Sequence, residues 1–236
     1  MKGFILTSCH ETDRQENVKE LQALLPALER VEAIYPRYEK IPFIDHIRKL
    51  SGTRTGHALR LGEIGCLLSH RKIWRIITKL ASNETDMFLV FESDSHIKNI
   101  DLLKDQFDKV AGNYDLFFWG AWEGHMKLLR SSRQKINDRY IIGEPFIKSV
   151  YCTYGYSLNR NAAAYLLHKT GKVGYPVDQF KRFIKRGDMA IGGVAPELIA
   201  TLDGGSYIKE QTPNRIYQYL FRKVLDVKNN LICLLR

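Results

Sequence analysis

The sequence predicts an α/β fold with a mostly parallel central sheet. Three short apolar runs, over 4–6, 87–91 and 116–119, lack the polar alternation of a half-exposed strand and therefore predict buried strands. Helical patterns separate them, one over 17–33 and a stronger one over 64–80. Strands that alternate with helices are typical of a parallel sheet with helices on its faces.

The other elements follow from local patterns. In the helix over 64–80, Leu67, His70, Trp74 and Ile77 form one stripe at helical spacing. Two polar stretches, over 35–56 and 123–144, predict exposed excursions. The second contains a group of basic residues, Lys127, Arg130, Arg133, Lys135 and Arg139. No internal repeat or linker interrupts the chain, so a single domain with elaborations is expected.

Length and composition set broad limits. The 236 residues suffice for one domain, and 44% hydrophobic with 26% charged residues excludes wholesale disorder. The four cysteines lie far apart without a C-x-x-C pair, which predicts free thiols in a reducing compartment. The first apolar run is too short for a signal peptide, and no window approaches the roughly 20 apolar residues of a membrane span. We therefore expect a soluble, cytoplasmic protein.

The charge is strongly basic, with 36 Lys and Arg against 26 Asp and Glu, which points to a polyanionic partner. Residues 215–236 repeat apolar side chains at three- and four-residue steps among five basic residues and one acid. This pattern predicts a basic amphipathic helix, which lies on an anionic leaflet, packs on the domain, or does both. We accordingly divide the chain into a domain over 1–210 and this helix over 211–236.

Two acids stand where α/β proteins bind ligands. Glu92 and Asp94 directly follow the strand over 87–91, beyond its carboxyl end. Two carboxylates so close repel each other unless a cation lies between them, and Mn²⁺ or Mg²⁺ takes such oxygen ligands together with substrate phosphates. The alternative is an acidic turn in which Asp94 or Ser95 caps the next element of the chain. For His70 a core role is the simpler interpretation, and Glu63 suits the start of its helix.

Motifs that are absent narrow the class. There is no G-x-G-x-x-G after the first strand, no phosphate-binding G-x-x-x-x-G-K-[ST], no H-E-x-x-H and no G-x-S-x-G. Dinucleotide oxidoreductases, P-loop NTPases, zinc proteases of this type and α/β-hydrolases therefore lose support.

Residues 61–74 read L-G-E-I-G-C-L-L-S-H-R-K-I-W. They resemble the G-E-[IV]-G-C-x-x-S-H-x-x-x-W signature of glycosyltransferase family 25, which includes bacterial lipooligosaccharide galactosyltransferases and collagen galactosyltransferases. Later segments keep the family's order: L-V-F-E-S-D at 89–94 against a strand ending in E-D-D, Y-G-Y-S-L at 154–158, P-V-D at 176–178 and P-E-L-I at 196–199. Arg14 matches one arginine of the family's E-R-R. Asp13, Gln15 and Ser93 are departures, and the tail lies outside the match.

The resemblance implies a GT-A-type Rossmann-like fold, a nucleotide-sugar donor and inverting transfer. Asp94, with Glu92 directly or through water, would hold a divalent ion, Mn²⁺ or Mg²⁺, against the UDP diphosphate. Inversion needs a carboxylate that deprotonates the acceptor hydroxyl, and Asp178 is the first candidate and Glu123 the second. For Asp178 the alternative is an N-cap of a helix over 179–185. The residues expected at the donor are Thr7, Ser8, Arg14, Glu63, His70 and Glu92.

The resemblance also implies partners. The donor would be UDP-galactose used in β linkage, with UDP-glucose or UDP-N-acetylhexosamine as alternatives, and the acceptor a lipooligosaccharide or LPS outer core. The enzyme would be peripheral to the inner membrane, with the tail helix on its anionic surface and the stretch over 127–139 near acceptor phosphates. No nucleic acid is expected. The competing class is a non-catalytic protein that binds RNA or anionic lipid, supported only by Ser93 and the shortened N-terminal motif.

Overall fold

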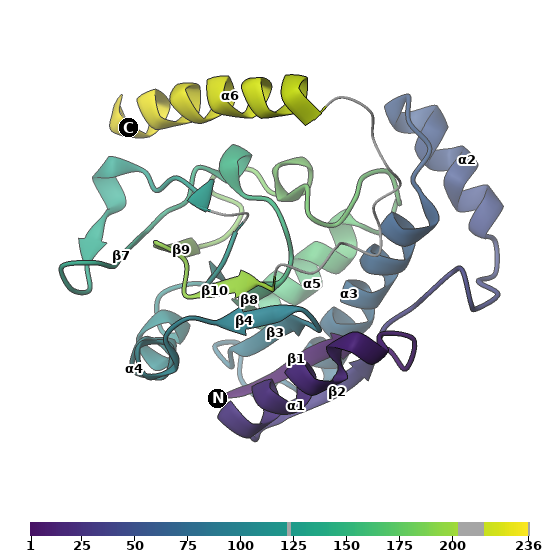
Figure 1. The fold of residues 1–236 in the computed structure, drawn as a ribbon, viewed down its shortest axis with the longest axis horizontal. Coiled ribbons are helices and arrows are strands. Elements are labelled where there is room, and N and C mark those ends of the chain that lie inside the picture. The colour runs from purple at the N-terminus through teal and green to yellow at the C-terminus, as the bar shows by residue number, and fades with distance from the viewer. Residues whose placement is uncertain (122–123, 203–214, 236) are drawn as a thin grey trace.

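The computed structural model describes residues 1–121, 124–202 and 215–235, and only the backbone of 215–222. Within these residues an eight-stranded sheet has the order β2-β1-β3-β8-β5-β9-β7-β6 (Figure 1). Its strands are β1 (Lys2–Thr7), β2 (Leu28–Glu32), β3 (Phe88–Glu92), β5 (Leu116–Phe118), β6 (Gln134–Lys135), β7 (Ile141–Gly143), β8 (Gly155–Leu158) and β9 (Ile191–Ala195). A second, two-stranded sheet pairs β4 (Ser95–Ile97) with β10 (Ile199–Thr201).

The α/β class is confirmed, while the sheet is more mixed than expected. Strand β1 pairs parallel with β2 and β3, and β5 pairs parallel with β9. Strand β8 runs antiparallel between β3 and β5, and β6 and β7 are antiparallel as well. The three predicted strands lie within or across β1, β3 and β5, and their side chains are almost entirely buried because both faces of the sheet are covered.

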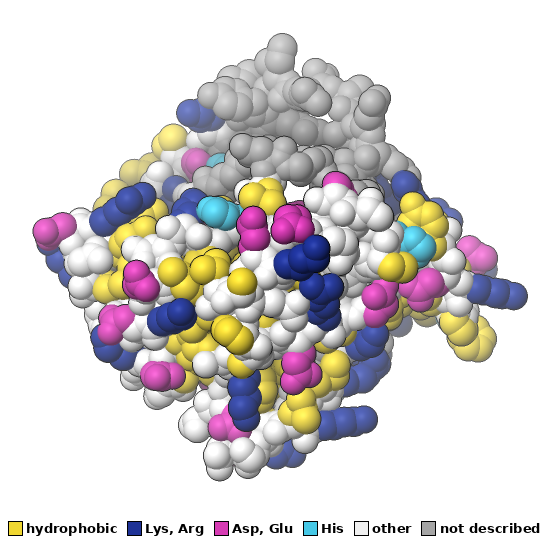
Figure 2. Space-filling model, turned by 60° about the horizontal axis from the view of Figure 1, so that its bottom comes forward, with side chains coloured by type: hydrophobic (Ala, Val, Ile, Leu, Met, Phe, Trp, Pro, Cys, Tyr) yellow, Lys and Arg dark blue, Asp and Glu magenta, His cyan; other side chains and the backbone are white. Residues whose placement is uncertain are grey.

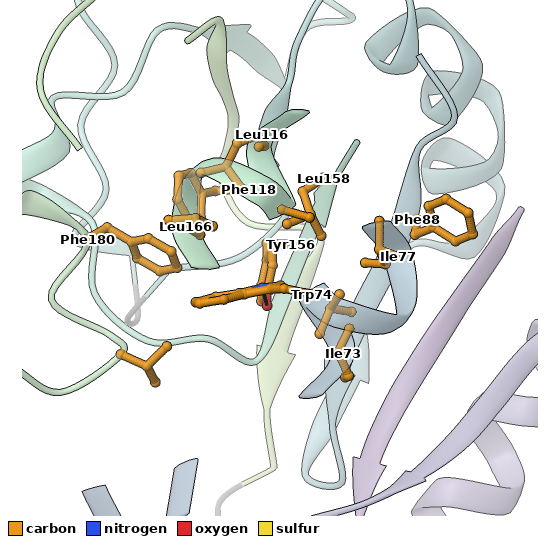
Figure 3. Packing of buried hydrophobic residues seen from close by; sticks show 14 of the residues in the cluster. Ile73, Trp74, Ile77, Phe88, Leu116, Phe118, Tyr156, Leu158, Leu166 and Phe180 are labelled. Carbon is orange, nitrogen blue, oxygen red and sulfur yellow. Dashed lines mark hydrogen bonds between the residues drawn. The ribbon is translucent and has the colours of Figure 1, made fainter. Parts of the chain in front are cut away.

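Helices cover the two faces in pairs. Helices α1 (Gln15–Leu24) and α4 (Ile100–Ala111) pack on one face, and α3 (Leu61–Leu80) and α5 (Arg160–Lys169) on the other. The predicted stripe of α3 lies in the second layer, where Trp74 and Tyr156 meet beside Phe180 (Figure 3). The short helix α2 (Ile44–Thr55) lies apart from the sheet, inside the stretch over 35–56 that the sequence presented as an exposed excursion.

The helix predicted over 17–33 is wrong in its second half. Helix α1 ends at Leu24, and residues 28–32 form the edge strand β2. Pro26 explains the break, because its ring disfavours a helical conformation at Leu25, which has φ −134° and ψ 79°. The consequence is functional, since β2 delivers residues 33–38 to the same sheet edge as Glu92. The helix expected over 179–185 is also shorter, a single 3₁₀ turn, η5 (Phe180–Arg182).

The tail forms helix α6 (Arg215–Leu235), which runs along the side of the molecule opposite α1 (Figure 1). It packs on the domain through the buried Cys233 and through Asp226, whose carboxylate lies 2.9 Å from His125 Nδ1. Its outward face exposes five apolar side chains at helical spacing, Val224, Val227, Leu231, Leu234 and Leu235. In the described part of the chain, no helix combines the length and hydropathy that a membrane span requires.

Candidate active site

The carboxyl ends of β1, β2 and β3 open into a cavity of about 300 Å³. The start of α3 and the loop after β2 close its sides, and Glu92, Ser93 and Asp94 lie among its lining residues. Four arginines also line it, Arg14, Arg37, Arg48 and Arg60. Carboxylates and guanidinium groups therefore meet in one cavity, at the sheet edge where α/β proteins bind ligands.

A buried chain of hydrogen bonds fixes Glu92. Trp74 Nε1 lies 2.9 Å from the Tyr156 hydroxyl, which lies 2.8 Å from His70 Nδ1, and His70 Nε2 lies 3.3 Å from Glu92 Oε1. Trp74 can only donate, so the Tyr156 oxygen accepts from it. The ionised Glu92 can only accept, so His70 Nε2 donates to it, and Nδ1 of a neutral His70 then accepts from the Tyr156 hydroxyl. His70 thus acts as a buttress of the acidic site, and it is fully buried.

Thr153 gives Glu92 a second donor. Its hydroxyl hydrogen-bonds the same Oε1 atom that receives His70, and no described residue donates to Oε2. Burial opposes ionisation of Glu92, yet the hydrogen bonds from His70 and Thr153 and the charge of Arg14 lower the pKa of its carboxyl. The preceding residue, Cys152, has φ 70°, a left-handed conformation that costs a non-glycine residue on the order of 1–2 kcal/mol. Such strain is typical of functional sites.

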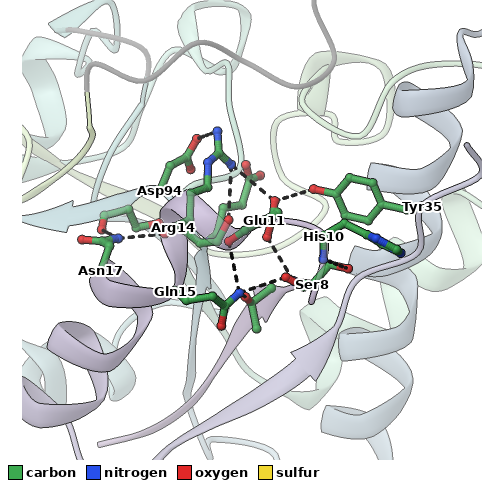
Figure 4. A network of polar contacts seen from close by, with 12 residues as sticks. Ser8, His10, Glu11, Arg14, Gln15, Asn17, Tyr35 and Asp94 are labelled. Carbon is green, nitrogen blue, oxygen red and sulfur yellow. Dashed lines mark hydrogen bonds and ion pairs between the residues drawn. The ribbon is translucent and has the colours of Figure 1, made fainter. Parts of the chain in front are cut away.

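Asp94 is held from one side only. Its Oδ2 lies 2.9 Å from Arg14 Nη2, while Oδ1 is buried and has no hydrogen-bond partner among the described residues. Burial and the charge of Glu92 raise the pKa of Asp94 to about 6. Figure 4 shows Arg14 between Asp94 and Glu11, and the latter also accepts from the Tyr35 hydroxyl. Arg14 therefore neutralises only part of this acidic cluster.

These oxygens fit a divalent cation. Asp94 Oδ1 is buried without a partner in the described chain, and the bonds from His70 and Thr153 to Glu92 both go to Oε1, which leaves Oε2 for a ligand. Both are hard oxygen ligands of the kind that Mn²⁺ and Mg²⁺ prefer. Cys66, His70 and Glu92 form a second ligand set, with ligand atoms within 4.8 Å of one another. That set is softer, and it would require His70 Nε2 to release the proton that it donates to Glu92. Glu92 and Asp94 are therefore the better candidate ligands for a hard divalent cation.

Asp178 belongs to the same electrostatic cluster, although it does not line the cavity. Its Oδ1 is buried and has no hydrogen-bond partner among the described residues. Burial, then the charges of Glu92 and Glu63, raise the pKa of Asp178 to about 6. The residue that precedes η5 is Gln179, and no side chain caps that turn, so the N-cap alternative for Asp178 is not observed. Glu123, the second candidate base, lies outside the described residues.

The remaining predicted donor residues brace the site from outside the cavity. The Thr7 hydroxyl accepts from Gln15, and the Ser8 hydroxyl donates to Glu32 at 2.7 Å. Glu63 accepts from the backbone N–H of Arg60 at 2.8 Å and so stabilises the start of α3, as its position predicted. Of the residues predicted at the donor, Arg14, His70 and Glu92 line the cavity.

Several site residues have no clear signal in the sequence. Glu11 and Tyr35 come from the loops after β1 and β2, Thr153 lies just before β8, and Tyr156 lies within it. The sequence gives no signal for Tyr35, because the spacing of apolar residues in β2 predicts the second half of a helix instead of a strand that leads to the site. Beside it, the rings of His10 and Tyr38 stack with centroids 4.1 Å apart. The Y-G-Y-S-L segment was the available signal for Tyr156, but its spacing gives no indication of a bond to His70.

Tyr156→Phe tests the hydrogen-bond chain. Removing the hydroxyl leaves two buried groups, Trp74 Nε1 and His70 Nδ1, without their partner. We expect the free energy of unfolding to fall by about 2–6 kcal/mol, because each of the two orphaned groups costs about 1–3 kcal/mol. The matched control is Tyr154→Phe, which removes a buried hydroxyl that donates to the carbonyl of Ala121 and lies outside this chain of hydrogen bonds. Urea unfolding should show the larger loss for Tyr156, and equal losses would contradict the shared role of its hydroxyl.

The comparison with known proteins identifies the family of the chain. The family model of glycosyltransferase family 25, described as LPS biosynthesis proteins, matches residues 2–181. That range contains the candidate site residues Arg14, His70, Glu92, Asp94 and Asp178. A search of curated proteins finds no match to the chain. Because the family model covers well over half of the sequence, the chain belongs to glycosyltransferase family 25 and is a glycosyltransferase of the LPS biosynthesis type.

Proposed function

We propose that the enzyme transfers a hexose from a UDP-sugar, with inversion, to an LPS outer-core acceptor, and that the donor is UDP-galactose used in β linkage. The observation that carries the proposal is that the carboxylates of Glu92 and Asp94, the latter with a buried oxygen that has no described partner, line one cavity together with four arginines. A nucleoside diphosphate with a divalent cation complements both sets of charges. Glucose and N-acetylhexosamine donors are the alternatives that the first experiment separates.

The arginines suit the diphosphate. A guanidinium group offers a planar fork of donors that matches phosphate oxygens, so Arg14, Arg37, Arg48 and Arg60 can bind the donor's anionic part. The stacked His10 and Tyr38 pair, beside Tyr35 in the cavity wall, offers a flat surface for the base. A volume of about 300 Å³ lies at the lower end of the range for small-molecule pockets.

The proposed mechanism uses three carboxylates. Glu92 and Asp94 hold the cation, and a divalent ion bound there would neutralise charge on the leaving diphosphate. Asp178, with its pKa raised to about 6, is ionised at neutral pH and is a stronger base than an ordinary aspartate. It accepts the proton of the acceptor hydroxyl as that oxygen attacks the anomeric carbon. The bond from this carbon to the diphosphate breaks, and UDP leaves with the electron pair.

UDP release from a panel of UDP-sugars tests the proposal, with Mn²⁺ or EDTA and a lactose- or heptose-type acceptor. We expect one donor to release UDP with Mn²⁺ and to stop in EDTA. Release with UDP-glucose alone would reassign the sugar, and release that survives EDTA would remove the ion from the mechanism. No release from any donor, together with no thermal stabilisation by UDP and Mn²⁺, would overturn the proposal.

Helix α6 supports a peripheral place on the cytoplasmic side of the inner membrane. Its exposed apolar stripe has the spacing of a helix face, and Lys223 and Lys228 are exposed beside it. An anionic leaflet would cover the apolar side chains and attract the lysines. On the face of the molecule shown in Figure 2, acidic and basic side chains are interspersed, so that face offers no comparable basic surface.

Val227→Ser/Leu231→Ser tests the membrane contact and leaves the packed side of α6 unchanged. We expect binding to vesicles with anionic lipid to weaken at least about tenfold, because burying one such side chain is worth about 1.5–3 kcal/mol. Transfer to a soluble acceptor should be unaffected. The control is Leu80→Ser, an exposed leucine at the end of α3. Vesicle sedimentation reads out the difference, and unchanged binding would remove α6 from the contact.

A further inference from the structure

A second cavity, about 690 Å³, shares no lining residue with the donor cavity. Three segments enclose it: residues 144–148 after β7, residues 184–191 before β9, and residues around the 3₁₀ turn η3 (Arg130–Ser132). Neither the cation ligands nor Asp178 line it. It is therefore a separate candidate site, larger than the cavity that the transfer reaction uses.

Its walls are mostly apolar. Leu129, Pro145 and Ile184 are buried, and other side chains of the wall are partly exposed toward the cavity, namely Phe146, Ile147, Met189 and Ile191. Tyr114 adds a second aromatic ring, and the uncharged polar side chains of the lining are those of Ser132 and Gln134. A hydrocarbon chain would gain the hydrophobic free energy of covering them, about 25 cal/mol per Å².

The cavity's charged residues are basic with one exception. Lys148, Lys181, Lys185 and Arg186 line it, and Glu144 is the only acid among its described lining residues. The Glu144 carboxylate is already bound by Arg186, at 2.9 and 3.3 Å. Lys181 donates to the Tyr151 hydroxyl at 3.0 Å, while Lys148 and Lys185 are exposed. A ligand seated here meets an excess of ammonium donors above an apolar wall, so the complementary ligand is an anionic amphiphile.

The cavity also lies near helix α6, the element that carries the proposed membrane contact. Leu129 and Ser132, which line it, belong to the η3 region, and α6 packs against η3. The apolar stripe of α6 stays exposed while Cys233 on the same helix is buried against the domain. A lipid of the leaflet covered by α6 would therefore lie close to the cavity.

We propose that this cavity binds one anionic glycerophospholipid, with an acyl chain against the apolar walls and the phosphate at Lys148, Lys181 and Lys185. The ligand is not a substrate, so the site goes beyond the transfer reaction. Only the source of the lipid depends on the proposed membrane contact, and soluble short-chain lipids separate the two ideas.

Calorimetry on the full chain tests the site with dihexanoyl phosphatidylglycerol below its micellar concentration. We expect phosphatidylglycerol to bind, and dihexanoyl phosphatidylcholine to bind at least about tenfold more weakly. Lys148→Glu/Lys185→Glu should weaken binding of phosphatidylglycerol at least about tenfold and leave UDP binding unchanged. The control, Lys79→Glu/Lys104→Glu, makes the same change of net charge at exposed positions of α3 and α4. Val227→Ser/Leu231→Ser in α6 should retain the binding.

Several results would overturn the inference. Equal binding of the two lipids would show that the lysines do not select an anion. Equal losses in the cavity and control variants would show an effect of net charge alone. Inorganic phosphate that competes as well as the lipid would show that the apolar walls contribute nothing. The charge reversals are at exposed lysines and should not unfold the protein, which a thermal melt checks. Ile147→Trp is a second variant, which fills the cavity and should also abolish binding.

Discussion

Asp94→Asn is expected to reduce donor turnover by about three orders of magnitude, since loss of a cation ligand removes several kcal/mol of charge stabilisation at the leaving group. Asparagine keeps the size of the side chain, so the substitution removes the charge that would bind the cation at Oδ1, which has no partner within the described chain, and the ion pair of Oδ2 with Arg14. UDP release with saturating donor and Mn²⁺ is the measurement. Near-normal activity would remove Asp94 from the site.

The same variant should be more stable than the wild type, which distinguishes a functional loss from a folding defect. The pKa of Asp94 is about 6 in the folded protein and 3.8 in the unfolded chain, so folding favours the protonated form. The associated stability is present below pH 3.8 and is lost as pH rises through 6. In EDTA at about pH 7.5, Asp94→Asn should therefore gain on the order of 1–2 kcal/mol, allowing for the lost Arg14 contact. Urea unfolding should show the gain disappear near about pH 4.

Exposed acids provide the control for that gain. The pKa of Asp105 is lowered by the hydrogen bonds from Lys109 and Gln106, so its charged form is favoured by folding. Asp105→Asn should show no stabilisation under the same conditions. An equal gain in the free energy of unfolding in both variants would indicate an effect of net charge alone and not a loss of repulsion within the cluster around Glu92.

Asp178→Asn should lower transfer to the acceptor by about a thousandfold, within the about 10²–10⁴ that a positioned general base contributes. Asparagine keeps the size of the side chain but cannot accept the acceptor's proton. UDP affinity measured without metal should stay within about twofold, because Asp178 does not line the donor cavity. The measurement is kcat for transfer beside a UDP titration. Transfer within about threefold of wild type would move the base elsewhere, and Glu123→Gln would then be the next variant.

Much of the fold could be predicted because continuous apolar runs and a helical stripe are local signals. Strand β2 could not, since Leu28 and Val31 are its buried residues and their three-residue separation imitates a helix. An edge strand pairs on one side only, here with β1, and so it lacks the continuous apolar run of β3. Pro26 was the available correction.

The candidate site divides in the same way. Glu92 and Asp94 follow a recognisable strand, so their place could be predicted from the chain itself. The donors that orient Glu92 could not, because Thr153 lies 61 residues away from it and Tyr156 lies 86 residues from His70. Only the strand order β1-β3-β8 brings these side chains together. The motif identified His70, while its donated proton follows from tertiary structure.

The activity of the enzyme depends on the register of strand β8. Tyr156 pairs with Val90, and its side chain lies on the face of the sheet that helix α3 covers, where it meets Trp74. Sliding β8 by a single residue would turn that side chain to the opposite face and withdraw its hydroxyl from His70. Misaligned molecules can remain compact and spectroscopically sheet-like, yet they would lack an oriented Glu92. Recovered turnover per molecule would therefore count the fraction of chains that reached the native alignment.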